Sequence, residues 1–92
     1  MDYERICQTA VKSYGSFHQT LKAMEEMGEL TTALVKFKDG RVDYESVIDE
    51  IADATIMMFQ LSLIFDKDKV EDRINEKLKR LEMRLKTEDD EC

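Results

Sequence analysis

The 92-residue chain holds no proline and no tryptophan, is 42% hydrophobic and 38% charged, and carries a formal charge of -7. This composition indicates one small, highly helical domain. Fourteen Lys and Arg against twenty-one Asp and Glu exclude the basic surface that DNA or RNA requires, so we expect no nucleic-acid polymer as a partner. The chain shows neither a membrane-length apolar run nor a leader pattern, which predicts a cytoplasmic protein with no membrane partner.

Four helices are predicted, because the only strong helix breakers are three glycines, Gly15, Gly28 and Gly40. The first helix spans residues 3–14 and ends at Gly15, whose permissive backbone suits a helix end. The second spans residues 16–38 and ends where Asp39 and Gly40 turn the chain.

The second helix opens with a capping-box pattern, in which Ser16 is the N-cap and Gln19 its partner. Its residues recur at alternating steps of four and three, which predicts a stripe that faces a partner helix. The members of this stripe are Phe17, Leu21, Met24, Gly28, Thr31 and Val35. Gly28 weakens the helix, and we expect it to permit close approach of another helix or of a metal cluster.

The third helix, near residues 43–65, is apolar almost all round, since eleven of the fifteen residues from 51 to 65 are Ile, Ala, Met, Phe or Leu. Such a helix must be covered on most sides, and three other short helices cannot cover it alone. The sequence therefore predicts an all-α four-helix bundle that assembles through this helix as a homodimer or homotetramer.

The fourth helix begins at Asp68, with Glu71 as its capping partner. Its apolar residues follow at steps of four, four, three and four, and its other face is densely charged. These apolar residues are Val70, Ile74, Leu78, Leu81 and Leu85. We expect a single domain over residues 1–86, followed by a disordered acidic tail over residues 87–92.

Two pairs of acidic residues stand out. Glu50 and Asp53 lie three residues apart within the apolar third helix, where an ionised carboxylate is costly unless it is paired or bound to a metal. Glu26 and Glu29, preceded by Glu25, form a matching pair on the second helix. The connection between the two helices is short, so an antiparallel hairpin places both pairs at about the same height.

Four converging carboxylates without a cation would repel one another. Oxygen ligands favour hard ions, which predicts Mg²⁺, with Mn²⁺ as a substitute. A di-iron site requires Glu-x-x-His pairs, and the single histidine, His18, lies outside both acid pairs. Asp66-Lys67-Asp68 lacks the glycine of a calcium loop.

Residues 25–29, Glu-Glu-Met-Gly-Glu, and residues 50–53, Glu-Ile-Ala-Asp, resemble the paired EExxE and ExxD motifs of MazG-like proteins. These proteins belong to the all-α nucleoside triphosphate pyrophosphohydrolases. Residues 75–80 resemble the family's third element, an Asn-x-Lys followed by arginine on the last core helix. The resemblance spans about residues 16–85.

The resemblance implies a MazG-like bundle that cleaves a nucleoside triphosphate to its monophosphate and pyrophosphate, in house-cleaning of the nucleotide pool. It implies that Mg²⁺ is held by Glu26, Glu29, Glu50 and Asp53. Glu25 and Glu26 are the candidate catalytic residues, with Glu25 as an extra ligand or the base that orients water. The predicted substrate-binding residues are Lys22, Asn75, Lys77 and Arg80.

Other readings stay open. Glu25, Glu26 and Glu29 could form a solvated helix face, and Glu50 with Asp53 could form an ion pair with a basic residue such as Lys22. The principal alternative function is a noncatalytic helical interaction module whose acidic cluster binds a cation or a basic partner. A third reading keeps the metal site but assigns it another phosphorylated compound, such as a nucleotide alarmone or a modified nucleotide.

Overall fold

A computed structural model of the chain describes residues 1–91, and the side chains of residues 1–88. Over these residues the protein is all helical, with four helices and no strand. They are α1 (Tyr3–Tyr14), α2 (Ser16–Lys38), α3 (Tyr44–Phe65) and α4 (Lys67–Glu91). The predicted all-α class and the order of the four helices are confirmed.

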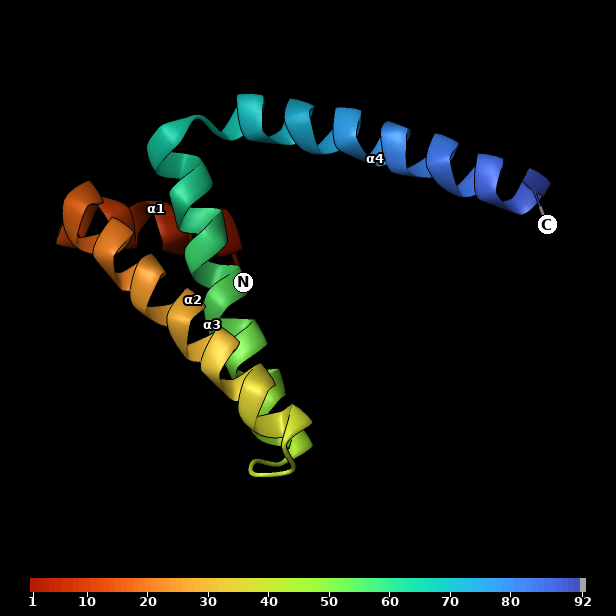
Figure 1. Cartoon of the computed structure of the whole chain (residues 1–92). Helices are drawn as coiled ribbons and strands as arrows, with labels where there is room; N and C mark the ends of the chain where they lie inside the picture. Colours follow the sequence, from red (N-terminus) through yellow and green to blue (C-terminus); the bar gives the residue numbers. More distant parts are fainter. Residues whose placement is uncertain (92) are drawn as a thin grey trace.

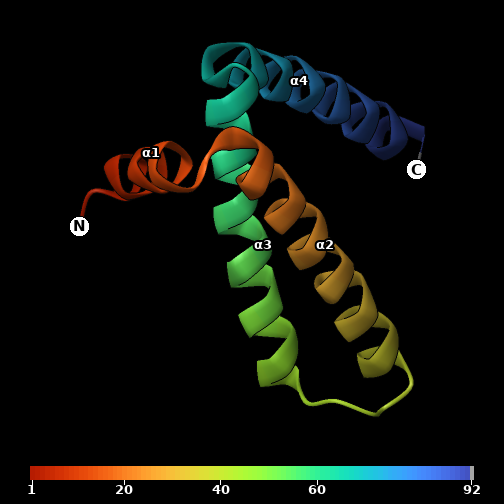
Figure 2. The ribbon, with the colours of Figure 1, turned by 90° about the vertical axis from the view of Figure 1, so that its left-hand side faces the viewer.

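Helices α2 and α3 form a long antiparallel hairpin, visible in both views (Figures 1 and 2). Its turn contains Gly40, whose φ of 74° suits a residue without a Cβ atom. The N-terminus of α3 is capped by Asp43, whose Oδ1 accepts a hydrogen bond from the Ser46 amide at 2.9 Å. Small buried side chains allow the two helices to approach: Ala23, Ala33 and Ala54.

The stripe of α2 that the sequence predicts to meet a partner helix does not face α3. Phe17, Leu21, Met24 and Val35 keep 49–78% of their surface exposed, and no described residue has an atom within 4 Å of the Cβ position of Gly28. The buried side of α2 instead presents Gln19, Ala23, Glu26 and Ala33. Helix α2 therefore turns a small and polar side to α3, and the predicted stripe meets no helix within the described residues.

Helix α1 crosses the end of the hairpin that is distant from its turn (Figure 2). Tyr3 meets Phe59 of α3 edge-on, with ring centroids 5.0 Å apart. Cys7 of α1 is 2% exposed, and burial raises the pKa of its thiol. Gly15, at φ 94°, joins α1 to α2.

Two capping predictions are wrong. Gly15, not Ser16, is the N-cap of α2, and no side chain caps that end. Gln19 is buried instead and donates from Nε2 to Gln60 Oε1 of α3 at 2.7 Å. Helix α4 begins one residue before Asp68, because Asp66 Oδ1 accepts a hydrogen bond from the Lys69 amide at 3.1 Å.

Helix α4 leaves the hairpin and projects away from it (Figure 1). It continues to Glu91, through five of the six residues for which the sequence predicts a disordered tail, while Cys92 lies outside the described residues. No glycine or proline follows Gly40, so nothing in the backbone stops the helix before Glu91. The described helices do not close into a compact four-helix bundle.

The open shape is measurable. The radius of gyration is 16.7 Å, whereas a compact chain of this length would have about 12 Å. Many large apolar side chains stay exposed, including Ile51 and Met58 of α3. No helix within the described residues is long and apolar enough to span a membrane.

Candidate metal centre

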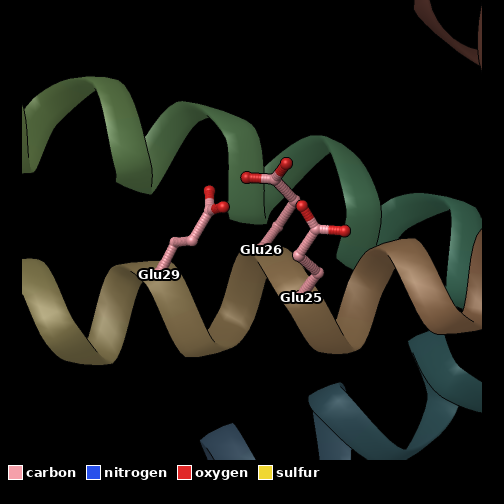
Figure 3. A group of neighbouring side chains, drawn as sticks. All are labelled: Glu25, Glu26 and Glu29. Carbon is pink, nitrogen blue, oxygen red and sulfur yellow. The ribbon is translucent and has the colours of Figure 1, made fainter.

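Acidic side chains from α2 and α3 meet halfway along the hairpin. One oxygen from each of Glu26, Glu50 and Asp53 lies within 4.8 Å of the other two. Glu25, Glu26 and Glu29 form a second group with the same spacing, and Figure 3 shows these three rising from α2 toward α3. Because Glu26 belongs to both groups, it is the hub of a five-carboxylate cluster.

Burial differs across this acid cluster. Glu26 is 8% exposed and Glu50 is half-buried, whereas Glu25, Glu29 and Asp53 are exposed. The sequence argument expected Asp53 to be enclosed in an apolar helix. That expectation is corrected, because α3 in a single chain is uncovered on the side where Asp53 lies.

Two oxygen atoms of the acid cluster are left without partners. Glu26 Oε2 and Glu50 Oε2 are both buried, and neither has a hydrogen-bond partner among the described residues. A buried carboxylate oxygen in this state has lost its hydration without compensation, which is unfavourable. A cation placed between the two helices would compensate both oxygens.

Lys22 supplies part of the missing positive charge. Its Nζ lies 3.2 Å from Glu26 Oε1 and 3.7 Å from Glu25 Oε1. The hydrogen bond to Glu26 and the nearby negative charges raise the pKa of Lys22. The ion pair involves Glu26 Oε1 and leaves Glu26 Oε2 without a partner among the described residues. Lys22 therefore neutralises only part of the acid cluster.

Crowding also affects Glu29. A hydrogen bond with the Glu26 side chain, together with the negative charge of Glu26, raises the pKa of Glu29. The Glu29 carboxyl therefore holds its proton to a higher pH than an isolated glutamate. Protonation of Glu29 and cation binding there therefore compete.

A shallow open pocket lies beside the acid cluster, on the side of Glu25 and Glu29. Residues that the sequence argument did not select also line it, among them Thr32 and Lys36 of α2 and Ser46 of α3. Lys36 places a second cation near the acids. The steps from Glu25 to Glu29, Thr32 and Lys36 are four, three and four, so helical periodicity could have identified them.

The predicted residues of α4 lie elsewhere. Asn75, Lys77 and Arg80 are exposed on the helix that projects away from the hairpin (Figure 1). Within the described residues, α4 packs mainly against α3 and meets α1 through the Lys67–Glu4 ion pair at its first residue. One chain therefore does not bring these three residues to the acid cluster, and their role stays a prediction.

Searches for related proteins returned no matching family model, no matching curated protein and no matching solved structure. The MazG-like resemblance thus rests on the motif residues of the sequence alone.

Proposed function

We propose that this protein is a Mg²⁺-dependent nucleoside triphosphate pyrophosphohydrolase that cleaves (d)NTP to (d)NMP and pyrophosphate. The observation that carries the proposal is the pair of buried, partnerless oxygens on Glu26 and Glu50, at the point where two acidic motifs meet. The motifs are those in which the chain resembles MazG-like proteins, and the role that follows is house-cleaning of the nucleotide pool.

In this proposal Glu26, Glu29, Glu50 and Asp53 hold the ion, and their oxygens suit Mg²⁺ or Mn²⁺. The bound ion supplies charge neutralisation at the phosphates and a lowered pKa for water. Water attacks the α phosphorus, the bond to the α,β-bridging oxygen breaks, and pyrophosphate leaves. Glu25 is exposed at the pocket and is the candidate base for the proton of this water.

A triphosphate near so many acids needs cationic help. Lys22 and Lys36 are the two lysines that α2 itself places beside the acid cluster, and we propose them as phosphate contacts. Asn75, Lys77 and Arg80 keep their proposed role only where another copy of α4 approaches the cluster. We also propose that the enzyme works in the cytoplasm as a homodimer or homotetramer, because so much apolar surface is exposed on one chain.

A second candidate is a noncatalytic helical interaction module whose acid cluster binds a cation. The exposed apolar faces of α2, α3 and α4 favour it, because such surface marks protein interfaces. Its metal site could be the same, but it would turn over no nucleotide.

Pyrophosphate release from a panel of ribo- and deoxyribonucleoside triphosphates, with and without Mg²⁺, separates the two candidates. We expect turnover that requires Mg²⁺ and is lost in Glu50→Gln. The matched control is Glu45→Gln, an exposed glutamate on the same helix but outside the acid cluster, which keeps activity.

Absence of turnover with every triphosphate would overturn the proposed activity. Thermal melting then decides what the acid cluster does. If Mg²⁺ raises the melting temperature of the wild type but not of Asp53→Asn, the cation-binding module is supported. If both respond equally, the acid cluster is not a metal site.

A further inference from the structure

Helix α4 carries an apolar stripe that no other helix covers within the described part of the chain. Ile74, Leu78, Leu81 and Leu85 share one face, and each keeps 43–55% of its surface exposed. This face continues from Val70, which is half-buried at the root of the helix. Most helical stability in proteins comes from packing of the apolar face, and the stripe of α4 lacks such packing within the described residues.

The stripe cannot be covered by the hairpin of its own chain. Only Asp66 separates α3 from α4, whereas antiparallel helices need a loop of about two to five residues. The junction is also fixed. Asp66 caps α4, its amide donates to Ser62 O at 3.0 Å, and Lys67 pairs with Glu4 of α1 at 3.5 Å.

The hairpin offers a matching apolar surface. Five large side chains of α2 and α3 form what we call the apolar face, and they are 36–74% exposed: Met27, Leu34, Ile51, Met58 and Phe65. A groove lined by Met27, Met58, Phe65 and Val70 runs from this face to the root of α4. The apolar face and the stripe of α4 are therefore continuous.

The apolar face lies away from the acid cluster. On α2, Met27 and Glu29 are two residues apart and so point to nearly opposite sides of the helix. No residue that lines the groove beside Met27 and Met58 also lines the pocket beside Glu29. A partner seated on the apolar face would leave the acid cluster open.

The surface area indicates how much a partner must cover. One chain exposes 7469 Å², against about 5,500 Å² for a compact protein of this mass. The difference, about 1,900 Å² per chain, lies in the range of obligate dimers, which bury about 1,000–2,500 Å² per partner. A short peptide or a small ligand would leave most of it exposed.

From these observations we propose that α4 is an exchanged arm, which packs its apolar stripe on the apolar face of a second copy of this chain. A two-fold axis makes the exchange reciprocal, so each copy covers the other. The inference does not depend on the proposed activity, because the surfaces involved exclude the acid cluster.

Sedimentation equilibrium of the full chain at micromolar concentration tests the exchange. We expect the wild type at twice the chain mass, and the double variant Leu78→Asp, Leu81→Asp at the mass of one chain. Met83→Asp is the matched control, since Met83 is an apolar residue of α4, 68% exposed, on the side opposite the stripe; it stays dimeric. A monomeric wild type, or a dimeric double variant, would overturn the proposal.

Hydrogen exchange of the unmodified chain tests the same interface without a substitution, so its result does not depend on whether a variant folds. We expect amides of residues 74–85 to be protected at concentrations where the dimer forms, and to lose this protection on dilution. Fast exchange of these amides in the dimer would show that α4 is not part of the interface, and would refute the exchange whatever the variants do.

Discussion

Replacing Glu26 by Gln should stabilise the protein in the absence of divalent ions. Glu26 is the hub of the acid cluster and is 8% exposed. The substitution removes the Lys22 ion pair, but the lysine is 44% exposed, and such a pair is worth about 0.2–1 kcal/mol. It also removes repulsion from four neighbouring carboxylates, those of Glu25, Glu29, Glu50 and Asp53, whose oxygens lie within 4.8 Å, and each like-charge pair destabilises by about as much as one opposite-charge pair stabilises.

Relief of repulsion therefore exceeds the loss of the ion pair. We expect the free energy of unfolding of Glu26→Gln to rise by about 1 kcal/mol or more in EDTA, which raises the melting temperature by about 4–8 °C. The wild type gains its own stabilisation from the ion. At Mg²⁺ ten times its dissociation constant the gain is about 1.4 kcal/mol, and Glu26→Gln should lack most of it.

Thermal melts followed by circular dichroism, in EDTA and in Mg²⁺ at matched ionic strength, measure both effects. Glu76→Gln removes an exposed carboxylate of α4 outside the acid cluster and should behave as the wild type. A Glu26→Gln protein that melts below the wild type in EDTA, or that keeps the full Mg²⁺ response, would refute this account of the acid cluster.

Three further predictions concern other residues of the hairpin. Because the pKa of Glu29 is raised in the folded chain, the wild type without metal should gain stability as the pH falls through this pKa, and Glu29→Gln should remove that gain; urea unfolding over a pH series in EDTA measures it. Gln60→Met should cost about 1–3 kcal/mol, because it removes the acceptor of the Gln19 amide in a buried pair. The double variant with Gln19→Met should recover part of this loss in urea unfolding, and additive losses would show that the two amides are not coupled. Gly28→Ala should raise the free energy of unfolding by about 0.5–1 kcal/mol, because an added Cβ meets nothing within 4 Å, and a loss instead would reveal a partner or ligand against Gly28.

The sequence alone determined the helices. Glycine positions and apolar periodicity located four elements whose bounds differ from the structure by a residue or so, apart from the end of α4. Helix formation is local, so a scarcity of breakers and the spacing of apolar residues are sufficient to predict it. The short turn near Gly40 likewise predicted an antiparallel hairpin with the two acid pairs at about the same height, and in the structure Glu26 meets Glu50 and Asp53.

Which face of each helix is buried was decided by tertiary structure. Periodicity identified the stripe that contains Phe17 and Met24 as the side of α2 that meets a partner. In the hairpin, a different side of α2, which contains Ala23 and Glu26, is buried. The alternative stripe is invisible to a hydrophobicity pattern, because small and polar residues form it. Only the approach of the two backbones decides which stripe fits.

For the candidate site as well, part could be predicted from the sequence and part depends on tertiary structure. The two acid motifs are local patterns, so sequence was sufficient to propose their residues and to infer that they meet. The exposure of Asp53, the ion pair of Lys22 with Glu26 and the distance of α4 from the acid cluster depend on contacts between helices. A one-residue junction at Asp66 sets the direction of α4, and no local propensity encodes that direction.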